Sequence, residues 1–248
     1  MFRLVMLLLT ALLLTPGAHA AEARKLALLS VMGDSLDVVT HRPAIGSSLD
    51  KNQHDSLNTG DGVINTMVLT EAMAAIHRAG LQNDTDVQAL TYAGAHDTAL
   101  WFEGKRFAPP ADLGAALTQT AATHLLLIQA HRAPSMLKAR NASLGSGYLE
   151  GLGFYIDREQ KMRRSDNGQV GVGFLAPYAY IKLRLINLAS GEVEREQIMT
   201  ASSTISSAKN PDGVDPWNAL DAAQKVSAIR RLLRGELNRA LPEMLRPH

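Results

Sequence analysis

Three short runs rich in apolar residues, each followed directly by polar residues, organise the first half of the chain. Residues 26–32 are apolar at nearly every position, and residues 124–130 read His-Leu-Leu-Leu-Ile-Gln-Ala. Residues 86–92 form a third, more mixed run between them. Apolar residues at successive positions are typical of strands that are buried on both faces, as in parallel sheets. The pattern therefore predicts three strands.

Segments with helical periodicity lie between these strands. Residues 61–80 begin with Asp61, which can cap a helix, and their apolar residues recur at helical spacing. Residues 110–122 predict a shorter, alanine-rich helix with a proline in its first turn. Residues 38–43 favour an extended arm or hairpin, and the polar residues 44–60 a surface loop. Alternating strands and helices are typical of parallel crossovers, which are right-handed in nearly all proteins.

The second half has a different pattern. Residues 134–176 are rich in glycine and basic residues, which favours a long antiparallel hairpin or an extended binding loop over packed core. Residues 178–188 alternate apolar and basic side chains, and a Ser-Gly turn leads into a partner strand at residues 192–200. Residues 215–245 predict a long amphipathic helix with a solvated basic face.

Together these elements predict a single three-layer α/β domain over residues 21–248. Its mixed sheet has parallel crossovers in the first half and an antiparallel hairpin in the second, and a long C-terminal helix follows. Residues 1–20 read as a signal peptide, because one arginine, a short apolar run and an Ala-His-Ala ending stand in order. We therefore expect a periplasmic or secreted protein with no integral membrane segment after cleavage.

Composition narrows the possible functions. The chain has no cysteine, which excludes a disulfide framework, a catalytic thiol and a lipoprotein anchored through cysteine. Lysine and arginine number 25 against 24 aspartate and glutamate residues, so no overall charge favours nucleic acid as a partner. We expect no metal and no cofactor, and the sequence does not indicate an oligomeric state.

Polar residues that follow the predicted strands are the candidate site. Asp34 and Ser35 follow the first strand, His96 and Asp97 follow the second, and His131 and Arg132 follow the third. If the strands are parallel, all of these side chains leave the same edge of the sheet, where ligands bind in open α/β sheets. They could converge into one site, or each could serve only its own loop.

Two of these residues belong to a short motif. Residues 33–36 read Gly-Asp-Ser-Leu, which resembles the tetrapeptide of the SGNH, or GDSL, family of exported esterases and lipases. The resemblance implies that Ser35 is a nucleophile activated by a histidine. The Asp-x-x-His pair that this family carries near its C-terminus is missing, since the only histidine after His131 is His248.

A second enzymatic interpretation involves metal ions. Gly-Asp-x-x-Asp at residues 33–37 and Gly-Ala-His-Asp at residues 94–97 resemble degraded blocks of calcineurin-type phosphoesterases. Ala95 stands where that family has a metal-binding asparagine, and the remaining blocks are missing, so too few ligands remain for a site with two metals.

The basic hairpin is the third candidate. Arg163 and Arg164 are expected near its tip, either as a solvated turn or as a contact, together with Arg132, for an anionic envelope component or a protein partner. The hairpin of residues 178–200, with Ser-Gly-Glu at its turn, resembles one in exported envelope assembly factors of the curli-secretion-channel and penicillin-binding-protein-activator type. That resemblance implies a compact α/β domain that binds an envelope protein or polymer without catalysis, which is our main functional prediction.

Overall fold

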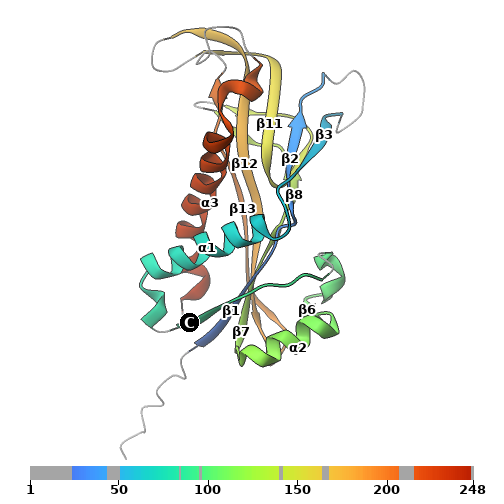
Figure 1. The fold of residues 1–248 in the computed structure, drawn as a ribbon, viewed down its shortest axis with the longest axis vertical. Helices are drawn as coiled ribbons and strands as arrows, with labels where there is room; N and C mark the ends of the chain where they lie inside the picture. The colour runs from blue at the N-terminus through green and yellow to red at the C-terminus, as the bar shows by residue number, and fades with distance from the viewer. Residues whose placement is uncertain are drawn as a thin grey trace, which may run out of the picture.

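The computed structural model describes most of the chain after its first residues (Figure 1). The described ranges are 24–43, 51–83, 85–94, 97–139, 142–163, 168–206 and 215–246. The expected signal peptide at residues 1–20, His96 and Arg164 lie outside them. Within these ranges, no helix has the length and apolar character needed to cross a membrane.

The three predicted parallel strands are present. β1 (Arg24–Val31) lies between β4 (Thr85–Leu90) and β7 (His124–Ala130) and runs parallel to both. Successive side chains of β1 point to opposite faces, because Leu26 and Leu28 join one apolar cluster while Ala27 and Leu29 join another. The central strand is therefore buried on both sides, as its nearly continuous apolar run predicts.

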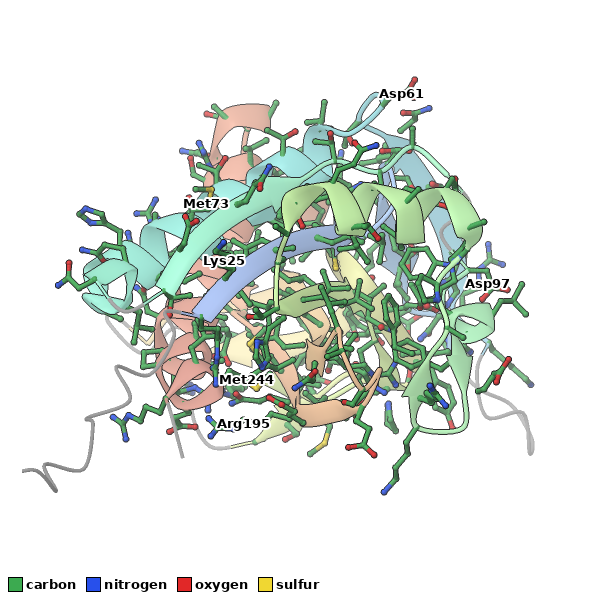
Figure 2. All side chains as sticks on the ribbon, turned by 90° about the horizontal axis from the view of Figure 1, so that it is seen from below. Lys25, Asp61, Met73, Asp97, Arg195 and Met244 are labelled. Atoms are coloured by element: carbon green, nitrogen blue, oxygen red, sulfur yellow. The ribbon has the colours of Figure 1, made fainter. Side chains whose placement is uncertain are left out.

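Helices cover both faces of the sheet, which gives three layers. α1 (Val63–Arg78) and α3 (Ala222–Leu245) pack on the face that carries Leu26 and Leu28, and α2 (Ala111–Thr120) packs on the other. Figure 2 shows the last turn of α3 at Met244 beside Arg195 of β13 (Val193–Ser202). The predicted fold class, a mixed-sheet α/β domain with a C-terminal helix, is confirmed.

The C-terminal helix begins later than predicted. Residues 216–219 form a separate 3-10 turn, η4 (Pro216–Ala219), and Leu220 is extended. Asp221 then caps α3 by accepting a hydrogen bond from the Gln224 backbone nitrogen, and the Gln224 side chain accepts one from the Asp221 backbone in return. This capping box sets the first turn of α3.

The second half adds long antiparallel strands. β11 (Tyr148–Arg163) and β12 (Val170–Asn187) form the predicted hairpin and run up the long axis of the molecule (Figure 1). The lower half of β12 pairs with β7, and its other edge pairs with β13. The long strand β12 thereby joins the parallel part of the sheet to the antiparallel part.

The prediction that residues 134–176 would be poor in packed core is wrong. All residues of β11 from 151 to 157 are buried, and the rings of Tyr155 and Phe174 stack with centroids 6.0 Å apart. The glycines permit this packing, because a Cβ at Gly153 would lie 2.0 Å from a neighbouring backbone oxygen. Three short strands, β8 (Arg132–Pro134), β9 (Leu137–Lys138) and β10 (Ser143–Leu144), border this part of the core.

The expected surface loop at residues 44–60 contains a strand. β2 (Ser35–Thr40) pairs parallel with β11 and antiparallel with β3 (Gln53–Asn58), which is exposed at the edge of the sheet. Its six residues are all exposed, and among the described residues only one edge of the strand is paired, which explains why polar side chains form it. The remaining short elements are η1 (Leu81–Asn83), η2 (Thr98–Trp101), β5 (Phe102–Glu103), β6 (Arg106–Phe107) and β14 (Ile205–Ser206).

Candidate functional site

Asp34 ties the end of β1 to the start of α1. Its Oδ1 accepts a 2.7 Å hydrogen bond from the backbone nitrogen of Gly62, and its carbonyl oxygen accepts bonds from both the backbone nitrogen and the hydroxyl of Thr59 at 2.9 Å. A carboxylate at a helix N-terminus satisfies an otherwise unpaired N–H group and interacts favourably with the helix dipole. Asp34 therefore has a structural role in the observed geometry.

Ser35 is the first residue of β2, not part of a turn. It is exposed and lies opposite Asn58 of β3. Across the described ranges, no hydrogen bond joins its hydroxyl to an imidazole, and the predicted partner His96 is outside those ranges.

His131 lies in a different environment from Asp34. Its backbone nitrogen donates to the Tyr180 carbonyl at 3.0 Å, and burial together with the charge of Lys182 lowers the pKa of its imidazole. Lys182 alternates with Ile181 and Leu183, which face α3, so it points to the opposite face of the sheet from α1. In the described part of the chain, no hydrogen bond or ion pair links His131 to Asp34 or Ser35.

Arg132 serves its own strand pair. The Arg132 guanidinium lies 5.0 Å from the centroid of the Tyr148 ring. Arg132 of β8 is also the antiparallel partner of Glu150 of β11. A cation over an aromatic face and an opposite charge across the strand both stabilise the pairing of these two strands.

The sequence interpretation missed a polar cluster formed by Asp37, Tyr178 and His54. Oδ2 of Asp37 accepts a 3.0 Å hydrogen bond from the Tyr178 hydroxyl and lies 3.2 Å from Nδ1 of His54. Four strands meet here: Asp37 of β2 and Tyr178 of β12 lie on either side of Gly153 of β11, and His54 comes from β3. Burial, followed by the charge of Asp37, raises the pKa of Tyr178 far above its usual range, so the phenol stays a hydrogen-bond donor.

Two further buried tyrosines follow the same pattern. The Tyr155 hydroxyl lies 3.1 Å from Nδ1 of His41 and accepts a 3.1 Å bond from the Ser146 backbone nitrogen. The Tyr180 hydroxyl accepts a 2.9 Å bond from the Met136 backbone nitrogen. Part of this arrangement has a signal in the sequence: Tyr178 and Tyr180 are two positions apart in β12, and residues at that spacing lie on the same face of a strand. These hydroxyls connect the sheet to the loops that cover it.

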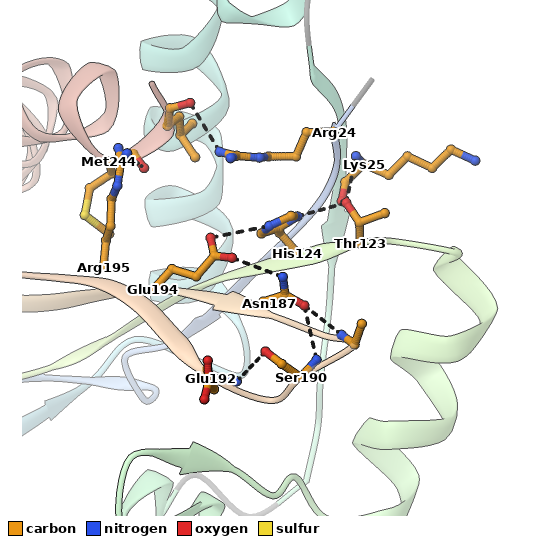
Figure 3. A network of polar contacts seen from close by, with 12 residues as sticks. Arg24, Lys25, Thr123, His124, Asn187, Ser190, Glu192, Glu194, Arg195 and Met244 are labelled. Carbon is orange, nitrogen blue, oxygen red and sulfur yellow. Dashed lines mark hydrogen bonds and ion pairs between the residues drawn. The ribbon is translucent and has the colours of Figure 1, made fainter. Parts of the chain in front are cut away.

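A second network surrounds His124 at the amino end of β7 (Figure 3). Its Nε2 lies 3.4 Å from Glu194, and its Nδ1 lies 2.9 Å from the Thr123 hydroxyl. Burial and the nearby charge of Arg24 lower the pKa of His124, while Glu194 acts in the opposite direction. A neutral imidazole that donates to Glu194 accepts the Thr123 hydroxyl at its other nitrogen.

The Thr123 hydroxyl and the Glu194 carboxylate, on either side of the His124 imidazole, also bond to other parts of the protein. The Thr123 hydroxyl also lies 3.1 Å from the Lys25 carbonyl oxygen and accepts from the Lys25 backbone nitrogen at 3.2 Å. Asn187 donates to Glu194 at 3.0 Å and accepts from the backbone of the β12–β13 turn. His124 and Asn187 also line an open cavity of about 610 Å³ with apolar walls, but their polar atoms are already bonded within the protein.

The exposed end of the β11–β12 hairpin carries basic and apolar side chains together. Lys161 pairs with Val172, and Arg163 pairs with Val170, so these four residues share one face of a two-stranded ribbon. The valines are 54% and 57% exposed, and both basic residues are exposed as well. Arg163 and Val170 form the last described pair of the hairpin. We call these four residues the hairpin patch.

The described residues do not provide the set of ligands that the metal-dependent interpretation requires. Within the described ranges, no group of three or more histidine, cysteine, aspartate or glutamate side chains could hold a metal ion. Asp37, a ligand in that interpretation, is bonded to Tyr178 and His54, while Ala95 and His96 lie outside these ranges.

Comparison with known proteins does not assign a family. No family model matches the sequence, and no curated protein matches it. Among similar solved structures, a DUF330 protein from Xanthomonas campestris is 9% identical, with 90% of this chain and 83% of that chain covered and a TM-score of 0.39. A minor lipoprotein from Acinetobacter baumannii is 6% identical, with 90% and 92% covered and a TM-score of 0.34.

A third similar structure is the PelC dodecamer from Paraburkholderia phytofirmans. It is 10% identical, with 87% of this chain and 85% of that chain covered and a TM-score of 0.33. At these identities and TM-scores, the similarities assign neither a family nor a function to the chain.

Proposed function

We propose that the protein is exported to the periplasm or beyond and binds an envelope protein or polymer without catalysing a reaction, using the hairpin patch as its contact surface. The observation that carries this proposal is the pairing of two exposed valines with two basic residues, Lys161 with Val172 and Arg163 with Val170. Apolar side chains at the centre of a contact exclude water, and charges around them select the partner and its orientation.

The chemistry of the hairpin patch favours an anionic partner with some apolar surface. Both charged members are cations, and the β11 strand behind them is fixed in the core by residues 151–157. The paired strands hold the backbone of the hairpin patch in place, which lowers the entropy lost on binding. An acidic protein surface and an anionic envelope polymer both meet this description.

Binding is tested with a double charge reversal, Lys161→Glu with Arg163→Glu. The matched control is Lys25→Glu with Arg231→Glu, which changes the net charge equally at exposed positions in β1 and α3. Co-sedimentation with purified peptidoglycan and lipopolysaccharide, and photocrosslinking in cells from an amino acid placed at Val170, measure binding. A crosslinker at Leu100, which is 79% exposed, is the control for non-specific contact.

We expect a discrete crosslinked product or sediment that the hairpin variant loses and the control variant keeps. Cell fractionation should recover the protein outside the cytoplasm. Recovery in the cytoplasm, or equal binding by both variants, contradicts the proposal. The hydrolase based on Ser35 and the metal-dependent phosphoesterase remain predictions from sequence, with no contact among the described residues that favours either.

A further inference from the structure

A crevice lies beyond the carboxyl ends of β1 and β4, and open α/β sheets bind small ligands outside the carboxyl ends of their strands. From the carboxyl end of β1 the chain passes through β2 and β3 to α1 on one face, whereas it leaves β4 towards η2 and α2 on the other face. Residues that follow these two strands line the crevice, with Asp34 after β1 and Thr91 after β4. β1 and β4 are adjacent and parallel, so both segments leave the sheet at the same edge.

The structure has a cavity of about 370 Å³ at this edge. Its polar lining comes from both connections, with Asp34, Asp61 and Asn65 on the α1 side and Thr91 and Tyr92 after β4. Figure 2 shows Asp61 at the periphery of the molecule, just before the start of α1. The volume lies near the lower end of the range for small-molecule sites, roughly 300–1,000 Å³.

Hydrogen bonds within the protein orient the Asn65 amide. Its Oδ1 accepts from the Met32 backbone nitrogen at 2.8 Å and from the Ser30 hydroxyl at 2.9 Å. A backbone nitrogen can only donate, which identifies this atom as the oxygen, and the NH2 group is then left as a donor. Among the described residues, no hydrogen bond uses that NH2 group.

The other lining groups also retain bonding capacity. Asp34 uses only Oδ1 for Gly62, so Oδ2 remains, and no described residue bonds to the side chains of Asp61 or Thr91. The cavity beside His124 differs in this respect, because its polar side chains are already bonded within the fold. The crevice therefore offers carboxylate acceptors and an amide donor, with a hydroxyl that can act as either.

This combination selects a ligand whose groups both donate and accept. Two carboxylates disfavour an anion, and a calcium ion needs six to eight oxygen ligands. Sugar hydroxyls donate to carboxylates and accept from an amide, and an aromatic ring such as that of Tyr92 can pack against the apolar face of a sugar. We propose that the crevice between β1 and β4 binds a neutral sugar unit through Asp34, Asp61, Asn65 and Thr91.

The test is a protein-detected NMR titration with the methyl glycosides of glucose, galactose and N-acetylglucosamine. Bound sugar should shift the backbone amides of Gly62, Thr91 and Ala93 and leave the hairpin patch unchanged. The double variant Asp61→Ala with Thr91→Val, both at exposed positions, should weaken binding at least about tenfold, or about 1.4 kcal/mol. Glu159→Ala, an exposed carboxylate on the hairpin, should bind as the wild type does.

Several results would overturn this proposal. They are shifts that map elsewhere, no shift with any of the three sugars, or the same shifts with calcium chloride alone. Unchanged sugar affinity in a folded double variant would also reject the site. The variant Lys161→Glu with Arg163→Glu should keep full sugar binding, so failure of the envelope function and failure of the sugar site are distinguishable.

Discussion

The Tyr178 hydroxyl reaches Oδ2 of Asp37 at 3.0 Å by crossing over Gly153, the residue that separates them in the sheet. The tyrosine ring occupies the space where a side chain at position 153 would stand, since a Cβ there would lie 2.6 Å from the hydroxyl oxygen. One hydrogen bond thus joins β2 to β12 across β11, and the absence of a side chain permits it.

Replacing Tyr178 with phenylalanine should destabilise the protein by about 1–3 kcal/mol, the usual loss when a partly buried charged group loses a donor. The ring stays in place, so the variant isolates the hydroxyl, and Asp37 keeps its contact with His54. Urea unfolding followed by circular dichroism measures the difference. A midpoint equal to that of the wild type would show that solvent replaces the tyrosine at Asp37.

Gly153→Ala should be at least as damaging, about 3 kcal/mol, because the new methyl group would also lie 2.0 Å from the Asp37 carbonyl oxygen. Gly235→Ala is the matched control, since no atom lies within 4 Å of a Cβ there and the residue is inside α3. That control should stabilise the protein by about 0.5–1 kcal/mol. Similar midpoints for the two variants would contradict the proposed close packing at Gly153.

Glu71 makes stability depend on pH. Its buried carboxylate on α1 accepts hydrogen bonds from Arg234 of α3 and lies 3.6 Å from Arg230, and these contacts lower its pKa below 4.5. Because the pKa of Glu71 is lower in the folded than in the unfolded protein, its ionised carboxylate stabilises the fold at pH values above the unfolded-state pKa. This stabilisation is lost as the pH falls through the folded-state pKa.

Glu71→Gln should therefore cost about 1 kcal/mol at pH 7, a figure kept small because both arginines are partly exposed to solvent. The difference from the wild type should shrink as the pH falls below 4.5. Unfolding free energies of both proteins, measured from pH 7 downwards at constant ionic strength, provide the comparison. A difference that stays constant with pH would rule out ionisation of Glu71 as its source.

Asp34 and Ser35 should respond differently to alanine substitution. Asp34→Ala removes the acceptor for the Gly62 nitrogen and should cost about 1 kcal/mol, as loss of a helix cap does. Ser35→Ala at an exposed position should change stability by less than about 0.5 kcal/mol. Wild-type protein should not react with a fluorophosphonate probe, and labelling that Ser35→Ala abolishes would instead support the hydrolase.

Local sequence pattern by itself determined many of the elements of this fold. The run at residues 26–32 specified a strand buried on both faces, and the alternation at residues 178–188 specified one with two different faces. The spacing of apolar residues predicted helix α1, and a proline at its beginning indicated where α2 starts. Each of these features depends on neighbours within a few residues, because periodicity reports which face of an element is apolar.

Tertiary structure alone decided which strands are neighbours. The sequence does not indicate that β2 pairs with β11, whose register joins Asp37 to Gly153, or that glycines of residues 134–176 lie in the core. In the sequence, a glycine in a surface loop cannot be told from a glycine packed under a tyrosine ring. Only the position of the partner strand separates the two cases. For the same reason, the sequence did not show that the candidate residues lie apart. Asp34 bonds to the start of α1, while His131 lies near Lys182 on the opposite face of the sheet.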